Sequence, residues 1–488
     1  MLKKILIRKS IQSLVDEAAQ KRHTFSRSLG ALNLTAIGIG AIIGTGLFVL
    51  TGQVAAEHAG PGILFSFLIA GMISAFAALC YAEFAALIPI SGSAYSYAYV
   101  TMGEFIAWVL GWGMTMQYLV SACTVSVAWS GYFNSLLNDF GLTIPSFLAS
   151  SPFGYHTQLG WSVTGSWINL PAMCIIAVMG LLISTGIKAA ASFNNVMVVL
   201  KLSVVVLFIA CGVAYIQMDN LTPFVPANTG VFGEFGWSGI LRGAGMLFFA
   251  FIGFDALSTL TQETKNPQKD MPRGMLGSLS ICTFVYLIFA VVLLGLVSYT
   301  KLGVPDPIAL AVNVLGSKFI WLRLFVKVAI LAGFTSVIMV MMLGQSRIFY
   351  TMAHDGLLPA KMGKIKDKTH VPLFTTTLIT ILGIIIAGLF PVGILANLVS
   401  MATLMTFAIV CFAVLILRYK QPNLHRPFKV PCMPWIPLLG GLCCVAQMTL
   451  FPLVTWIQLL SWLAIGCVVY FTYSIKRSKV QLQKKKHS

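Results

Sequence analysis

The chain has 488 residues, of which 58% are hydrophobic and only 9% are charged, and its mean hydropathy is +0.88. Soluble domains are about 45–50% apolar and about 25% charged, so this composition excludes a water-soluble globular protein. A helix that spans a bilayer uses about 20 residues, so about a dozen such helices would take up most of the apolar residues and leave no room for a separate soluble catalytic domain.

Apolar runs separated by charged or Pro/Gly-rich breaks predict twelve membrane-spanning helices. In chain order we expect them at 32–50, 62–88, 105–133, 167–185, 193–215, 237–260, 273–298, 323–349, 373–390, 395–417, 434–451 and 454–474. The predicted fold class is therefore an all-α integral membrane protein. Nearly all of the ten cysteines lie inside these runs without the spacing of a zinc or haem site, which predicts packing roles and no metal.

The net charge of +18 comes from 32 Lys and Arg against 14 Asp and Glu, a balance that suits either nucleic acid or an anionic membrane surface. Most of the basic residues fall in the two tails and in the loops after spans six, eight and ten. An even number of spans puts both termini on one side, and the positive-inside rule makes that side the cytoplasm. We therefore predict a multi-pass protein of the cytoplasmic membrane, with both termini cytoplasmic, that contacts the lipid bilayer and not nucleic acid.

The first and sixth spans are interrupted by glycines. The first contains GIGAIIGTGLF at 38–48, and the sixth contains FFAFIGFD at 248–255. Glycine costs about 1 kcal/mol relative to alanine inside a helix, so such segments indicate either close helix packing or a break. Because these spans begin the groups 1–5 and 6–10, they favour an inverted-repeat transporter with its site at the bilayer midplane.

A break at Gly44, Thr45 and Gly46 would create two poles. The N–H groups that open the second half-helix attract a carboxylate, whereas the carbonyls that end the first half, near 40–43, attract an ammonium. In span six the carbonyls around 249–251 would face the same cavity. A zwitterion satisfies both poles, so an α-amino acid is the expected ligand, held without charged side chains, metal or cofactor.

Six segments of the sequence together carry a family resemblance. They are 38–48, YAEF at 81–84 with PISGSAY at 89–95, 248–255, ETKNPQKDMP at 263–272, RIFY at 347–350 with DGLLP at 355–359, and RPFKVP at 426–431. In this order they resemble the amino acid–polyamine–organocation (APC) superfamily, and within it bacterial members of the cationic amino acid transporter branch. The resemblance implies alternating access and amino acid transport that is coupled to protons or runs as exchange.

The fold that this resemblance implies is a five-plus-five inverted repeat with two additional C-terminal helices and with spans 1 and 6 broken at the midplane. Its divisions would be a cytoplasmic tail at 1–30, repeats at 31–216 and 237–418, two additional helices at 434–474 and a basic cytoplasmic tail at 475–488. A bundle of spans 1, 2, 6 and 7 would rock against the remaining scaffold. A small single-span membrane protein is a partner that the resemblance allows.

Carried over by position, the resemblance places the substrate carboxylate on amides near Thr45 and Gly46. It places the amine on carbonyls near Ile42 and 249–251, with Phe251 as a gating aromatic over the ligand. The expected substrate-binding residues are Ile42, Ile43, Gly44, Thr45, Gly46, Gln117, Phe249, Ala250, Phe251, Ile252 and Met341.

Four ionisable residues near or inside spans need their own interpretation. Lys201 matches a span-five lysine whose ammonium is thought to replace a sodium ion in proton-coupled members, and we favour this coupling role over snorkelling. Lys327 lies near a span end, where snorkelling is favoured. Asp255 is expected to bond the amides freed by the break in span six, a role favoured over proton carriage. Glu83 is expected to order the loop that follows span two.

Met341 and Gln117 bear on the substrate's side chain. Met341 falls where span eight lines the family's pocket, although it could also be core packing, and its bulk favours a small or medium neutral substrate. Gln117 stands where many members of the branch have a glutamate, and a neutral amide attracts neither a guanidinium nor a proton. We therefore predict proton-coupled uptake of neutral L-amino acids such as alanine. The alternatives are a cationic amino acid (arginine or lysine) facilitator or exchanger, and a transporter-like amino acid sensor.

Other classes of membrane protein fit less well. An enzyme would need clustered acid/base or metal-binding side chains at membrane depth, but all seven histidines fall outside the predicted spans. The sequence has no nucleotide-binding loop, and it has neither the carbonyl filter repeat nor the rings of like charge of a channel. It therefore predicts a transporter and not an enzyme.

Overall fold

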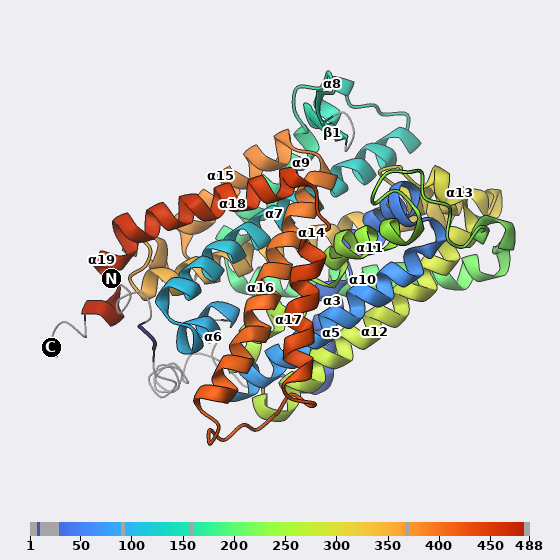
Figure 1. Ribbon diagram of the computed structural model, residues 1–488. Helices are drawn as coiled ribbons and strands as arrows, with labels where there is room; N and C mark the ends of the chain where they lie inside the picture. Colours follow the sequence, from blue (N-terminus) through green and yellow to red (C-terminus); the bar gives the residue numbers. More distant parts are fainter. Residues whose placement is uncertain (1–6, 10–28, 89–92, 157–159, 367–370, 483–488) are drawn as a thin grey trace.

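The computed structural model describes residues 7–9, 29–88, 93–156, 160–366 and 371–482 (Figure 1). Every predicted span coincides with helical segments of this structure. Within the described residues, eight helical segments are long and apolar enough to cross a membrane, and four further apolar helices are shorter. The chain is thus a multi-pass helical membrane protein, while its division into two five-helix repeats stays a prediction.

The elements follow one another along the chain as two sets. The first set is α3 (Ala31–Ile42), the π-helical turn η2 (Gly46–Leu50), α4 (Thr51–Val54), η3 (Ala55–Ala59), η4 (Gly60–Gly62), α5 (Ile63–Leu87), α6 (Ser93–Thr101), α7 (Glu104–Asp139), α8 (Ser146–Ala149), β1 (Phe153–His156), β2 (Gly160–Val163), α9 (Leu170–Thr185) and α10 (Ile187–Gly212). The second set is α11 (Gly236–Leu247), the 3-10 turns η7 (Phe248–Phe251) and η8 (Asp255–Glu263), α12 (Pro267–Leu296), α13 (Pro307–Val314), α14 (Ile320–His354), α15 (Leu373–Leu389), α16 (Val392–Lys420), α17 (Trp435–Met448), α18 (Leu453–Val469), η12 (Tyr470–Ser474) and α19 (Ile475–Arg477).

The long helices form two packed groups. Helix α12 packs against α3 and α5, and α11 packs against α5, which gives one group. In the other group α7 packs against α14 and α9, and α15 packs against α9 and α7. Helix α10 packs mainly against α14, and α16 lies between α7 and α17. Whether these two groups act as the bundle and scaffold that the family resemblance implies stays a prediction.

The first span is longer than the sequence predicted. It continues past residue 50 through η3 to Ala59, because the chain turns only at Gly60, whose φ of +56° begins η4. His58, expected outside the spans, therefore lies in the last turn of this helical segment, where its Nδ1 is 2.7 Å from the Gly233 carbonyl oxygen. Gly52 has a low intrinsic helix propensity, but packing keeps the chain helical at this position.

The described residues nearest the two termini lie at the same end of the molecule. Lys9 Nζ lies 2.6 Å from Asp355 Oδ1 at the end of α14. Close by in the fold, Glu104 at the start of α7 accepts hydrogen bonds from Gln481 Nε2 at 2.6 Å and from Ser478 Oγ. The Glu104 amide also donates to the Ile7 carbonyl. Most of the predicted tail at 1–30 lies outside the described residues, and the predicted tail at 475–488 is described as far as residue 482.

Contrary to the prediction, Lys327 does not snorkel. Its side chain is only 3% exposed, and its Nζ lies 2.6 Å from Asp139 Oδ2 and 3.0 Å from the Ser135 carbonyl oxygen. The lysine thus joins the start of α14 to the end of α7, because a carboxylate within reach offers it a better partner than the membrane surface.

Glu83 orders the loop between α16 and α17. It accepts two hydrogen bonds from the Arg418 guanidinium, at 2.9 and 2.6 Å, and lies 3.2 Å from Arg426 Nε. Its Oε2 also accepts the Val430 amide at 2.8 Å, so it fixes the chain between α16 and α17. The predicted target, the segment 89–92, lies outside the described residues.

We expect the substitution Glu83→Gln to lower the free energy of unfolding by about 3–5 kcal/mol, because it removes the negative charge that pairs with the buried Arg426 and the partly buried Arg418. Thermal unfolding of the purified protein in detergent measures this as a lower melting temperature. Asp219→Asn is the control, since Asp219 is an exposed carboxylate. Equal melting temperatures for the two variants would contradict the stabilising role of Glu83.

Candidate functional site

The first span is broken where the glycine pattern predicted. Helix α3 ends at Ile42, Ile43 is extended with φ −70° and ψ 111°, and the chain becomes helical again through Thr45 into η2. The amides that open the second half-helix have no acceptor within their own helix, and the carbonyls that close α3 have no donor within theirs. The break therefore presents a positive and a negative pole within a few residues of each other.

The sixth span is broken in the same way. The 3-10 turn η7 follows α11, Ile252 is extended with φ −64° and ψ 137°, and Gly253 has φ +126°, a value that side chains disfavour. Asp255 opens the next turn, and its Oδ1 accepts the Gly253 amide at 3.1 Å. This contact is the structural role that was expected for Asp255.

The two breaks touch each other. A Cβ atom added to Gly46 would lie 2.3 Å from Ala250 Cα, and one added to Gly253 would lie 2.7 Å from the Ala41 carbonyl carbon. Tyr286 of α12 spans the contact, because its hydroxyl lies 3.0 Å from the Ile42 carbonyl oxygen and 2.8 Å from that of Ala250. Only glycine at these two positions allows such a close approach of the two backbones.

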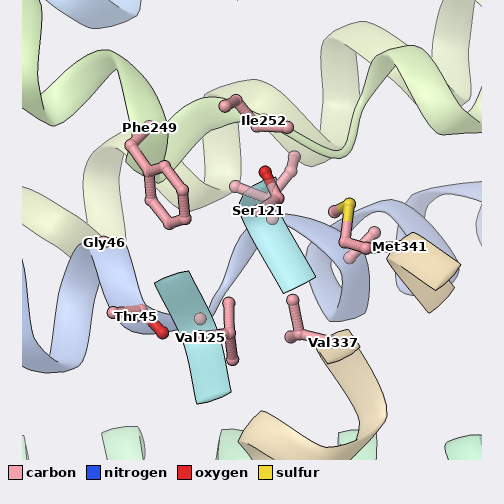
Figure 2. A pocket seen from close by; sticks show the side chains of 11 residues that line it. Thr45, Gly46, Ser121, Val125, Phe249, Ile252, Val337 and Met341 are labelled. Carbon is pink, nitrogen blue, oxygen red and sulfur yellow. The ribbon is translucent and has the colours of Figure 1, made fainter. Parts of the chain in front are cut away.

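A pocket with about 280 Å³ of empty space, its mouth included, lies beside this contact, between the breaks and helices α7 and α14 (Figure 2). It is lined by Ala41, Ile42, Gly44, Thr45, Gly46, Ser121, Val125, Phe249, Ile252, Val337 and Met341. None of these side chains is charged. Two hydroxyl groups of the lining, Thr45 Oγ1 and Ser121 Oγ, are buried without a hydrogen-bond partner among the described residues, so both are available to a polar ligand.

Most of the predicted substrate-binding residues line this pocket, but Phe251 does not. Its ring packs against those of Phe67 and Tyr286, with centroids 6.5 and 5.5 Å away, while Phe249 and Ile252 face the pocket (Figure 2). The 3-10 turn explains the difference, since it has three residues per turn and places residues three apart on one face. The aromatic residue that faces the pocket is therefore Phe249.

Three other predicted residues also lie outside the lining. The carbonyls of Ile43 and Ala250 are in the breaks but are bonded to Lys201 and Tyr286. Gln117 donates from Nε2 to Asp255 Oδ2 at 3.2 Å, beside the Tyr118 hydroxyl, which is 3.3 Å from the same oxygen.

Helices α7 and α14 contribute residues to the pocket lining that the sequence analysis did not predict, apart from Met341. Ser121 lies one helical turn beyond Gln117, Val125 one turn further, and Val337 one turn before Met341. The only signal for them is this four-residue spacing from the two residues that the resemblance singled out.

Lys201 lies next to the first break. Its side chain is completely buried, and its Nζ donates to the carbonyl oxygens of Gly40 and, at 3.0 Å, of Ile43. Both acceptors belong to the end of α3, so the ammonium of α10 is held by backbone carbonyls and not by a carboxylate. This arrangement matches the placement of a cation at the negative end of a half-helix.

The neighbouring glycines at 44 and 46 give a test of the contact between the breaks. A methyl group on Gly46 would collide with the backbone of Ala250, whereas the nearest atom to one on Gly44 is Val337 Cγ2 at 3.4 Å, an ordinary contact. We expect Gly46→Ala to lower the melting temperature of the purified protein strongly and Gly44→Ala to leave it nearly unchanged. Equal effects would show that the close approach at Gly46 does not exist.

Comparison with known proteins agrees with this geometry. The family model described as amino acid permease matches residues 29–478. The chain is 41% identical to the methylthioribose transporter of Bacillus subtilis (strain 168) over 461 residues, which cover 94% of this chain and 96% of that protein. It is 40% identical to the branched-chain amino acid permease BcaP of the same organism over 476 residues, 97% and 98% of the two chains.

More distant relatives belong to the cationic amino acid transporters. The vacuolar cationic amino acid transporter 4 of Arabidopsis thaliana is 35% identical over 409 residues, which cover 82% of this chain and 65% of the relative. These matches place the protein among membrane transporters and not among enzymes. With a family match over nearly its whole length, the chain belongs to the amino acid permease family of the APC superfamily.

Proposed function

We propose that the protein is a secondary active transporter that takes up neutral L-amino acids with small to medium aliphatic side chains, together with protons. The observation that carries this proposal is the pocket without charged side chains at the contact of two broken helices. Backbone poles satisfy the charges of a zwitterion, so the pocket needs no acid or base of its own.

In this proposal the substrate carboxylate binds the amides that open the second half of span one, at Thr45 and Gly46. The unpartnered Thr45 hydroxyl supplies a further donor. The substrate ammonium binds carbonyls that close the first half, near Ile42. Each carbonyl oxygen has two lone pairs, so the Ile42 carbonyl can accept the ammonium while it keeps the Tyr286 hydroxyl.

The side-chain part of the pocket favours an aliphatic substrate. Val125, Val337 and Met341 line it, and a guanidinium or ammonium placed among them would lose its hydration without gaining an acceptor. The relative named as a branched-chain amino acid permease supports leucine, isoleucine and valine beside alanine as substrates.

The transport cycle would use the two packed groups of helices. The group with α3, α5, α11 and α12 would rock against the group with α7, α9, α14 and α15, with two five-helix repeats and both termini in the cytoplasm. Lys201 would carry the coupling proton, because its ammonium bonds carbonyls beside the binding site. This assignment rests on the family resemblance and on that contact.

Uptake of radiolabelled leucine, alanine and arginine into proteoliposomes tests the substrate class. We expect leucine and alanine to accumulate when the proton gradient is directed inward, and arginine to be excluded. Arginine uptake that ignores the gradient would instead identify a cationic amino acid facilitator or exchanger. Binding of leucine without any transport would identify a sensor.

Two adjacent methionines of α14 allow a matched test of selectivity. Met341 lines the pocket, whereas Met342 is buried outside the lining. Met341→Ala should shift the ratio of phenylalanine to alanine uptake upward by at least about tenfold, because even one methylene group in an apolar pocket is worth about 1–3 kcal/mol. Met342→Ala should leave this ratio unchanged, even where it lowers total uptake. An equal shift in both variants would remove Met341 from the site.

The proton-coupling role is tested by two substitutions of Lys201. Lys201→Met removes the charge, and Lys201→Arg keeps a cation that does not release its proton. We expect both variants to lose stimulation by an inward proton gradient, while exchange of internal for external leucine continues in at least the arginine variant. Lys318→Met, at an exposed position, is the control. Gradient-stimulated uptake by Lys201→Arg would contradict the role.

A further inference from the structure

The segment between α7 and α9 contains an amphipathic β-hairpin. Strands β1 and β2 pair antiparallel, with Phe153 opposite Val163 and Tyr155 opposite Trp161. Because side chains alternate along a strand and directly opposed residues share a face, these four side chains form one face of the hairpin. The opposite face includes Gly154, Gly160 and Ser162. One face is thus aromatic and aliphatic, and the other is small and polar.

The apolar face is exposed in the protein. Phe153, Trp161 and Val163 are 38%, 46% and 79% exposed. Among the described residues, the ring of Phe390, at the end of α15, contacts them, with its centroid 6.0 Å from that of Phe153 and 6.3 Å from that of Trp161. Figure 1 shows α8 and β1 beside the end of α9, outside the body of long helices.

A second aromatic pair extends this surface. The rings of Phe147 of α8 and of Trp167, which is 71% exposed, lie tilted against each other with centroids 4.9 Å apart, and the Trp167 amide donates to the Phe147 carbonyl at 2.8 Å. The Asn169 amide donates to the Gly388 carbonyl, which fastens the segment to the end of α15. We call this surface the aromatic patch; its members are Phe147, Phe153, Trp161, Val163, Trp167 and Phe390.

The sequence around the aromatic patch lacks charge. Between Asp139 and Lys188 the chain contains no Asp, Glu, Lys or Arg, although about a quarter of the residues of soluble domains are charged. The patch also continues into the exposed apolar faces of α9 and α15, where Leu181 is 69% and Ile385 is 50% exposed. These two helices are apolar and belong to a multi-pass membrane protein, so their exposed faces meet lipid.

From these observations we infer that the aromatic patch is a lipid-contacting surface, which lies in the headgroup interface of the bilayer next to α9 and α15. A two-stranded hairpin with an exposed apolar face is marginal in water. The hydrocarbon core is excluded as well, because the free strand edges would leave N–H and C=O groups without partners there. The interface provides both water for these edges and cover for the rings, and it is where tryptophan and tyrosine gather in membrane proteins.

The inference requires only that the chain spans a membrane, and it is independent of the proposed substrate. The inference also suggests a role for the segment between α7 and α9 in the transport cycle. Helices α9 and α15 belong to the group around α7 and α14, so the aromatic patch would hold the scaffold at a fixed depth and tilt while the other group moves.

The experiment uses the full-length protein in vesicles of phosphatidylcholine and phosphatidylglycerol. Fluorescence is recorded for the wild type and for Trp161→Phe with Trp167→Phe, and the difference isolates the emission of these two tryptophans. Lipids brominated near the glycerol end of their acyl chains should quench most of this difference, and aqueous iodide should quench little of it. Quenching by iodide but not by the brominated lipid would overturn the inference, because the patch would then lie in water. Quenching by neither would also overturn it and would indicate cover by a second copy of the chain.

A matched pair of charge substitutions tests the orientation of the hairpin. Trp161 and Ser162 are adjacent but point to opposite faces. We expect Trp161→Lys to reduce the quenching of Trp167 by the brominated lipid, since a lysine on the apolar face draws the hairpin toward water. Ser162→Lys adds the same charge on the polar face and should leave that quenching unchanged. Equal behaviour of the two variants would contradict the proposed orientation.

Discussion

The close approach of two broken helices is the contact on which the site depends. Gly46 lies against Ala250, and Gly253 lies against Ala41, at distances that exclude any Cβ atom at either glycine. A break inside the membrane is costly, because the freed amides and carbonyls must be satisfied without water. Here Tyr286, Asp255 and Lys201 satisfy part of this demand with fixed side chains. Backbone on both sides of the first break lines the pocket, and in the proposed function its remaining amides and carbonyls would bind the two ends of the substrate.

This arrangement explains how so few charged residues serve a transporter of charged molecules. The net charge of a zwitterion is zero, and its two ends match the two ends of half-helices. Charged side chains are instead used away from the pocket, where Glu83 ties two arginines to a loop and Asp139 ties Lys327 to α7. In the proposed function, selectivity among amino acids would depend on the apolar part of the lining, in which Met341 is the largest aliphatic side chain.

The sequence predicted what local pattern and hydropathy determine, and it failed where long-range packing decides. The spans and the breaks near Gly44 and Gly253 follow from apolar length and from glycine. The choice of Phe249 over Phe251 depends on a 3-10 turn, which hydrophobic pattern does not reveal because both residues are aromatic. Ser121 and Val125 lie on α7, which is buried on most sides, so no periodicity marks the pocket face. The bond from Gln117 to Asp255 joins residues far apart in sequence and has no local signal at all.

Tyr286 and Lys201 both bond carbonyls at the first break, but they belong to different groups of helices. Tyr286 is on α12, which packs against α3, so it moves with the helix whose carbonyl it binds. Lys201 is on α10, which packs mainly against α14 in the other group, yet it binds the carbonyl of Ile43 at the end of α3. Any displacement of α3 relative to α14 must therefore break or stretch the bonds of Lys201 while those of Tyr286 persist. A charged ammonium makes such bonds stronger than a neutral amine does, so in the proposed proton-coupled cycle the charge of Lys201 would determine how firmly α10 is bonded to the end of α3.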